Sequence, residues 1–233
     1  MRLEPAPLAL DHLVVAARRL DEGVAWCEAV LGITPGPGGK HELMGTHNRL
    51  FNIASPAFPR AYFEIIAIDP DGAPPAFARW FDLDEPALQA ALERGPALVQ
   101  WMARTDHLAR VRDAAAAAGI DVGEIHRVQR QTEHGPLSWQ IALRRDGRRL
   151  FGGAFPGLIE WAGSHPTQRL PPTGVQLEHV DLRGLPERVS TWWPGGVTQQ
   201  AAAPHPLGAP IEARLSTPRG QVTLVSPSGE RAA

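Results

Sequence analysis

Two glutamates occupy segments of this chain in which nearly every neighbour is apolar. Glu64 lies in AYFEIIAID and Glu160 lies in PGLIEWAG, and His12 has a comparable setting in LALDHLVVA. An ionised carboxylate in such a segment is costly unless it is paired with a cation, protonated or bound to a metal ion. Each residue alone also has a simpler interpretation, as a hydrogen-bonded core histidine or as a glutamate paired with an arginine. Together, one imidazole and two carboxylates favour a metal site.

These residues belong to a pattern that the chain repeats. LDHLVVAARRLDEGVAWCEAVLG is followed by AYFEIIAID, and LVQWMARTDHLARVRDAAAAAG is followed by PGLIEWAG. When the two helical parts are aligned, His12 falls on Gln100, and when the two closing segments are aligned, Glu64 falls on Glu160. An internal repeat indicates the architecture before any single residue is interpreted. If the two copies pack around a pseudo-twofold axis, we expect these four side chains to converge.

Each copy predicts a strand, a helix and further strands. The strands are runs of Val, Ile and Leu bounded by Gly and Pro. We expect one domain at residues 8–165, built from modules at 8–70 and 97–163. The Pro-rich segment 71–96 is predicted to be a crossover with a short helix, outside the core. Residues 172–228 predict a third, incomplete βαββ-like unit that packs against the other two.

Three residues indicate where the first helix of each module begins or ends. Asp21 and Asp106 are predicted N-caps, because an aspartate before a helix accepts a hydrogen bond from an unpaired backbone N–H. Gly32 is predicted to end the first helix, since glycine readily adopts the left-handed conformation found there. These signals place the two helices at equivalent points of the repeat.

The composition is that of an ordinary globular protein. The chain has 233 residues, 43% hydrophobic and 21% charged, with a formal net charge of −2. Neither a nucleic acid nor a membrane is therefore expected as a partner. The opening residues MRLEPAPLALDH lack the pattern of a signal peptide, and the lone Cys27 fits a reducing compartment, so we expect a cytoplasmic protein. The expected partner is a small-molecule substrate, and a homodimer is compatible with these properties.

The motifs also resemble a known family. DHLVVAARRLDEGVAWCEAVLG, GTHNRLFNI and YFEIIAIDP are similar to the first half of a glyoxalase-like domain of the vicinal-oxygen-chelate superfamily, which includes glyoxalases, bleomycin-resistance proteins and dioxygenases. WMARTDHLARV and FPGLIEW resemble its second half. The resemblance implies an α+β fold in which paired βαβββ modules form an open, cup-shaped mixed sheet with flanking helices. A third, partial module would accompany them here.

The resemblance further implies a divalent metal held by the first and last strands of each module. Carried over by position, the ligands are His12, Glu64, Gln100 and Glu160. Gln100 is the weakest of these, because an amide is a poor ligand and the alignment permits an error of one residue. Nitrogen and oxygen ligands of this kind suit Zn, Ni, Mn, Co or Fe.

Such a metal would stabilise the enediolate or alkoxide of a small oxygenated substrate, which is the chemistry of an isomerase, an epimerase or a lyase. Glu64 or Glu160 would serve as the catalytic base. Substrate-binding candidates are His47, Asn48, Arg49, Trp101 and Trp139, although polar residues at a strand end and tryptophans in a core have ordinary structural roles as well.

Two alternatives remain open at this point. A non-catalytic binding or sequestration protein of the same fold would have lost the metal ligands. An extradiol-type iron dioxygenase needs two histidines and one carboxylate. Gln100 stands where the second histidine would fall, so this alternative requires His107 or His179 to lie beside His12.

Overall fold

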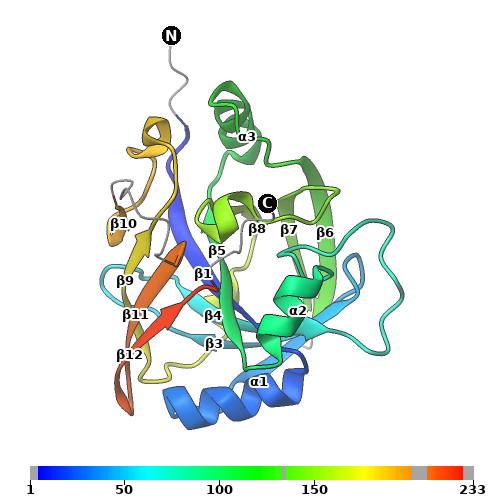
Figure 1. Ribbon diagram of the computed structural model, residues 1–233, viewed down its shortest axis with the longest axis vertical. Coiled ribbons are helices and arrows are strands. Elements are labelled where there is room, and N and C mark those ends of the chain that lie inside the picture. The colour runs from blue at the N-terminus through cyan, green and yellow to red at the C-terminus, as the bar shows by residue number, and fades with distance from the viewer. Residues whose placement is uncertain (1–4, 133–134, 201–208, 228–233) are drawn as a thin grey trace.

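An eight-stranded mixed sheet runs through the centre of the protein, in the order β2-β3-β4-β1-β5-β8-β7-β6 (Figure 1). The computed structural model describes residues 5–132, 135–200 and 209–227. The central strands are rich in Val, Ile, Leu and aromatic residues, which suit a pleated, buried surface. The eight strands are β1 Ala9–Ala16, β2 Gly36–His41, β3 Thr46–Asn52, β4 Tyr62–Ile68, β5 Ala97–Arg104, β6 Glu124–Thr132, β7 Gly135–Leu143 and β8 Gly157–Ala162.

The sheet consists of two modules with the same strand arrangement. In each module the first strand pairs in parallel with the last, as β1 with β4 and β5 with β8. The modules join through antiparallel pairing of β1 with β5. The strand order is therefore the same when read from either edge towards the centre. This confirms the predicted α+β class and the paired βαβββ modules that form a cup-shaped sheet.

The helices of the two modules begin differently from what the sequence predicts. Helix α1 spans Leu20–Trp26 and continues as a π-helical turn to Leu31, and Gly32, at φ 75°, ends it as expected. Asp21 lies inside the first turn of α1, and Arg19 occupies the N-cap without a side-chain capping bond. The predicted cap at Asp21 is therefore wrong.

Helix α3, Leu108–Ala117, has His107 rather than Asp106 at its N-cap. The backbone N–H of Leu108 donates to Oε2 of Glu160 at 2.7 Å instead. A carboxylate from a distant strand thus takes the place of the predicted local cap. Among the described residues, no helix is long and apolar enough to cross a membrane.

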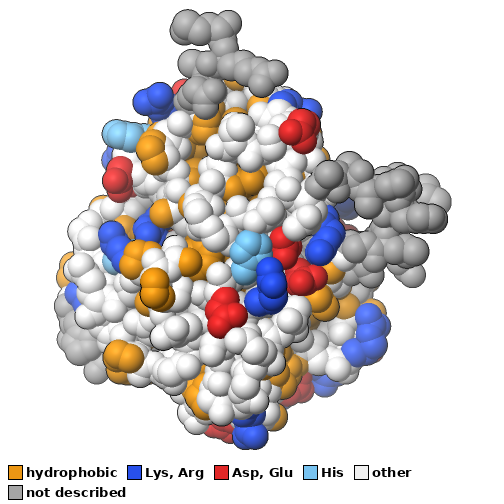
Figure 2. Space-filling model, turned by 90° about the vertical axis from the view of Figure 1, so that its left-hand side faces the viewer, with side chains coloured by type: hydrophobic (Ala, Val, Ile, Leu, Met, Phe, Trp, Pro, Cys, Tyr) orange, Lys and Arg blue, Asp and Glu red, His pale blue; other side chains and the backbone are white. Residues whose placement is uncertain are grey.

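A second, four-stranded sheet lies beside the large one, on the left in Figure 1, with the order β10-β9-β11-β12. Its strands are β9 Gln176–Leu182, β10 Val197–Gln199, β11 Ile211–Thr217 and β12 Gly220–Val225. Buried residues of β9 and β11 share one apolar core with α1, α3 and one face of the large sheet. The side of the molecule that carries this second sheet presents charged groups of both signs among scattered apolar ones (Figure 2).

The segment between the modules is part of the core, contrary to the prediction for residues 71–96. Its helix α2, Pro86–Leu92, and the residues before it bury Trp80, Phe81 and Leu83 against the other face of the large sheet. Phe81 and Asp82 have φ values of 61° and 59°, an uncommon conformation for residues other than glycine. Arg149 holds this turn, because its Nε donates to Asp82 Oδ2 at 2.7 Å. The concave face is therefore partly filled by the connecting segment.

Candidate functional site

His12 and Asp11 form a hydrogen-bonded pair on β1, at the concave face of the large sheet. Nδ1 of His12 lies 2.6 Å from Oδ1 of Asp11, and both side chains are buried. Consecutive residues of a regular strand point to opposite faces. The pairing of β1 with β5 shifts register between Leu10 and His12, however, and such a bulge re-aims side chains. The bulge explains how two neighbouring residues meet.

Asp11 is held in place by three donors. Besides His12, its Oδ2 accepts from Nε2 of His165 at 2.9 Å and from Nε1 of Trp161 at 3.0 Å. Nδ1 of His165 accepts from the backbone N–H of Thr167 at 3.2 Å, so its proton is on Nε2. Burial opposes the charge of Asp11, but the hydrogen bonds from the two histidines outweigh it and lower the pKa of this carboxyl group. Asp11 is a fixed anion that orients the His12 ring.

Glu64, on β4, faces the other nitrogen of His12. Its Oε2 is 3.4 Å from His12 Nε2, and its Oε1 accepts from Nδ2 of Asn48 at 2.6 Å. Burial disfavours the charged form of Glu64, but His12 and Asn48 stabilise it and lower its pKa to about 2. Burial also disfavours the imidazolium of His12, and Asp11 and Glu64 together raise its pKa to about 9. At neutral pH the site holds an imidazolium between two carboxylates.

His41 and Tyr62 lie against this pair and remain uncharged at neutral pH. Burial lowers the pKa of His41 to about 4, and the positive charge of Arg130 adds to this effect against the attraction of Glu64. Burial raises the pKa of the Tyr62 phenol, whose ring stacks on His12 with 4.3 Å between centroids. The charged groups at the cavity are therefore the ion pair, its anchoring aspartate and Arg130.

The pair faces a cavity of about 40 Å³ that is largely apolar. A groove of about 880 Å³ lies next to it, between the segments of β2 and β6–β7. His41, Leu50, Arg130, Leu137, Trp139 and Pro166 line both spaces. Since the two spaces share these walls, a small molecule in the groove could present one atom to His12 and Glu64.

The structure does not bring Glu160 to this pair. Ile159 and Trp161 line the cavity, whereas the carboxylate of Glu160 caps helix α3 on the other face of the sheet. Neighbouring residues of a strand alternate between faces, so Glu160 and Trp161 cannot both face the cavity. Glu64 and Glu160 therefore occupy equivalent strands but point to different sides.

Gln100 is also separated from His12. Strands β1 and β5 pair His12 with Met102 and Val14 with Gln100, which is the register expected if His12 and Gln100 are equivalent residues of the two modules. Nε2 of Gln100 donates to the backbone oxygen of Phe155 at 2.8 Å, and the side chain lines a different small cavity. Met102, and not Gln100, lines the cavity at His12.

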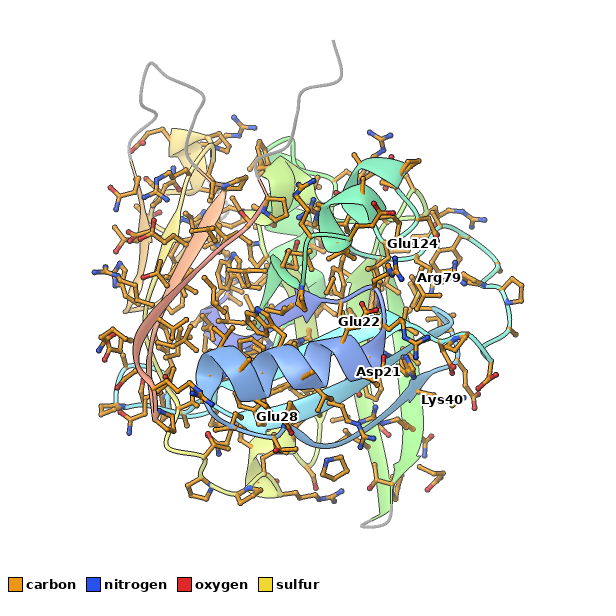
Figure 3. All side chains as sticks on the ribbon, turned by 60° about the horizontal axis from the view of Figure 1, so that its bottom comes forward. Asp21, Glu22, Glu28, Lys40, Arg79 and Glu124 are labelled. Atoms are coloured by element: carbon orange, nitrogen blue, oxygen red, sulfur yellow. The ribbon has the colours of Figure 1, made fainter. Side chains whose placement is uncertain are left out.

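Of the predicted substrate-binding residues, Asn48 and Trp139 line the cavity. His47 and Arg49 alternate with Asn48 along β3 and line a depression beside α1, the helix that carries Asp21, Glu22 and Glu28 in Figure 3. Trp101 is fully buried in the core behind the sheet, and its Nε1 donates to the backbone oxygen of Ala154 at 2.9 Å.

Comparison with known proteins agrees with this architecture. Residues 10–197 match the family described as a glyoxalase-like domain. The chain belongs to this glyoxalase-like family of the vicinal-oxygen-chelate superfamily. The predicted resemblance is thereby confirmed, and the match extends beyond the two modules into β10. No curated protein matches the chain in sequence.

Two solved structures align with this chain at low sequence identity. A hypothetical protein from Staphylococcus aureus aligns with a TM-score of 0.55 and 16% identity, covering 95% of this chain and 88% of that one. Methylmalonyl-CoA epimerase from Mycobacterium tuberculosis aligns with a TM-score of 0.37 and 18% identity, covering 69% of this chain and 91% of that one. The first similarity indicates a common fold, and the second is too weak to support a conclusion about this protein.

The metal centre that the resemblance implies does not fit the residues of this glyoxalase-like protein. His12 and Glu64 are available from the first module, but Met102 faces the cavity in the second module and Glu160 caps a helix. Among the described residues, no three His, Cys, Asp or Glu side chains are grouped so that they could hold a metal ion. The four predicted ligands therefore do not form one coordination sphere.

Neither His107 nor His179, the two histidines considered for a dioxygenase site, contacts His12. His107 is the N-cap of α3, and Nε2 of His179 is 3.3 Å from Asp181 in the second sheet. The histidines that do lie at the site, His41 and His165, were not predicted. Their segments, KHELMG and SHPTQ, read as loops, and nothing in the sequence shows that they close on β1 and β4.

Proposed function

We propose that this protein is an enzyme that moves a proton at a carbon next to a carbonyl group, as an isomerase, epimerase or lyase does. His12 and Glu64 are the catalytic pair in this proposal. The observation that supports it is the buried ion pair at the cavity, with the Asp11 anion fixing the ring of His12. A buried ion pair contributes little to stability compared with well-packed apolar residues, so its presence at a cavity favours a chemical role.

The arrangement supports a charge-neutral proton exchange. Glu64 takes the proton from the substrate carbon while His12 donates its Nε2 proton to the carbonyl oxygen, which gives an enol. The pair then consists of a carboxylic acid and a neutral imidazole. Loss of the imidazolium removes the main reason for the low pKa of Glu64, about 2, so the acid is formed at little cost. Return of both protons, at the same or a neighbouring carbon, completes the reaction.

Asp11 and Asn48 are positioning residues in this scheme. Asp11 fixes the tautomer of His12 with Nε2 towards the substrate, as the aspartate of a catalytic triad does for its histidine. Asn48 holds one carboxylate oxygen of Glu64 and leaves the other towards His12. Trp139 and Trp161 form an apolar wall that excludes water from the exchange.

A binding protein without catalysis would use the same cavity, which is the alternative function. It has no need of the ion pair, because a neutral lining would hold an apolar ligand at lower cost. The two functions differ in one observable, the exchange of a carbon-bound proton with solvent.

The test is deuterium exchange from D₂O into a panel of 2-hydroxy carbonyl compounds and 2-substituted thioesters, followed by proton NMR. We expect the wild-type protein to accelerate loss of the α-proton signal, before and after dialysis against EDTA. His12→Gln should lower the rate by about 10²–10⁴, the usual contribution of a general acid or base. Exchange by wild type that His12→Gln leaves unchanged contradicts the role of His12, and dependence on a metal contradicts the mechanism.

A further inference from the structure

Arg130, on β6, is half-buried, and two nitrogens of its guanidinium group are buried without partners. Neither its Nε nor its Nη1 is exposed, and neither has a hydrogen-bond partner among the residues that the structure describes. A charged donor that is buried and unpaired costs more free energy than almost any other single feature of a protein interior. An anion bound at this position would supply the missing hydrogen-bond acceptors.

The guanidinium lies where a substrate would be. Arg130 lines both the cavity at His12 and Glu64 and the adjoining groove. Gly39 gives it room, because a Cβ atom at that residue would be 2.6 Å from Arg130 Nη1. Gly39 in turn donates its backbone N–H to Asn48 Oδ1 at 2.8 Å, and Asn48 holds Glu64. The unpaired cation and the catalytic pair are thus built into one framework.

The groove around Arg130 is positively charged, although the chain as a whole has a net charge of −2. Among the described residues that line it, Glu42 is the one acid, and the cations are Lys40, Arg127, Arg130 and Arg169. Lys40 pairs with Asp69 at 2.7 Å, and its place at the edge of the sheet is visible in Figure 3. Arg169 bonds to a neutral partner, the hydroxyl of Thr132, at 3.1 Å. The field in the groove therefore favours an anion.

From this geometry we infer that the substrate carries an oxyanion, a carboxylate or a phosphate, that binds Arg130 while its reactive carbon lies at His12 and Glu64. The position of the reactive carbon rests on the proposed function, whereas the anion site depends on Arg130 itself. A planar guanidinium can donate two parallel hydrogen bonds to the oxygens of such a group. The apolar wall of Trp139 and Leu137 would cover the carbon chain between the two ends.

The test measures binding of two probes, inorganic phosphate and malonate, by calorimetry and by thermal unfolding at constant ionic strength. We expect one or both to bind the wild-type protein and raise its melting temperature. Arg130→Gln should weaken binding at least about tenfold, the effect of losing a charge-assisted bond of ordinary strength. Without anion, Arg130→Gln should melt no lower than wild type, because two buried nitrogens without partners have been removed.

Arg127→Gln is the matched control, since it removes the same charge from the same strand at an exposed position. It should keep binding within about threefold of wild type. Arg130→Lys, which keeps the charge without the two parallel bonds, should fall between wild type and Arg130→Gln. The stronger of the two probes identifies the substrate anion as phosphate or carboxylate.

Three results would overturn the inference: no binding of either probe to wild type, equal binding by Arg130→Gln, or equal losses in Arg127→Gln and Arg130→Gln. The experiment also separates this inference from the proposed function, because His12→Gln should bind the probes normally. Anion binding without proton exchange overturns the catalytic proposal alone. Exchange without binding that depends on Arg130 overturns the anion site alone.

Discussion

The closing strands of the two modules have similar sequences and different roles. In β4, Glu64 points into the concave face and pairs with His12. In β8, Glu160 points to the other face and caps α3, while Ile159 and Trp161 take the concave side. The first module supplies the ion pair, and the second supplies an apolar wall, Arg130 and Trp161, which donates to Asp11.

This difference shows that a repeated fold does not require a repeated site. A metal shared between modules needs ligands from both, whereas an ion pair oriented by Asp11 needs only one strand pair and its neighbours. The face of the sheet to which Glu160 points decides between a shared metal site and an ion pair. Glu160 is the counterpart of Glu64 in the other module, so variants of Glu64 and His12 can be compared with variants of Glu160.

The largest contrast is expected in activity. Glu64→Gln should lower the rate of solvent proton exchange by about 10²–10⁴, because an amide cannot accept the proton. Glu160→Gln keeps an acceptor for the N–H of Leu108 and should remain within a few-fold of wild type. The NMR exchange assay measures both. Equal losses in the two variants would restore Glu160 to the catalytic site.

A second contrast is expected in the pH dependence of stability. The pKa of His12 is raised to about 9, so its contribution is complete below pH 6.5 and is lost as the pH rises through 9. The pKa of Glu64 is lowered to about 2, so its contribution is complete above pH 4.5 and is lost as the pH falls through 2. The ion pair should therefore stabilise the fold most between pH 4.5 and 6.5.

Urea unfolding at several pH values measures this effect as the difference in the free energy of unfolding between wild type and His12→Gln. We expect that difference to fall by an amount on the order of 3 kcal/mol between pH 6 and pH 9.5. The corresponding difference for Glu160→Ala should stay nearly constant over the same range. A constant difference for His12→Gln would show that the imidazolium and the carboxylates are not coupled.

The smallest effect concerns the structural role of Glu160. Glu160→Ala removes the acceptor for the first N–H of α3 and should lower the free energy of unfolding by about 1 kcal/mol, as loss of a helix cap does. Asp106→Ala, at the predicted but unused cap, serves as the control and should cost less. Chemical denaturation at pH 7 compares the two, and a larger loss in the Asp106 variant would reverse the assignment of the cap.

The sequence predicts the modules, and it predicts that His12 and Glu64 each lie in a strand among apolar residues. It does not predict that Met102 rather than Gln100 lines the cavity, because the pairing of β1 with β5 shifts register beside Gln100, between Val14 and Val15. The other register shift, between Leu10 and His12, brings Asp11 to His12, against the rule that strand neighbours face apart. The side on which Glu160 lies is equally hidden, since both faces of GLIEWA are apolar.

Arg130 was missed for a different reason. It lies in EIHRVQRQT, a strand with several polar and charged residues, and only the closure of β6–β7 against β2 shows which arginine is buried. Local patterns thus indicate the helices and strands and the polar residues that are unfavourable to bury. The tertiary contacts that compensate those residues follow from bulges and closures that leave no local signal.

The central claim, that His12 is paired with Glu64 and not with Glu160, can be tested without a substrate. Nitrogen-15 NMR of the labelled imidazole follows the protonation of His12 with pH in wild type, Glu64→Gln and Glu160→Gln. The account predicts a pKa of about 9 in wild type, the same value in Glu160→Gln, and a lower one in Glu64→Gln, which lacks one of the two neighbouring anions. An unchanged pKa in Glu64→Gln, or an equal fall in Glu160→Gln, would contradict it.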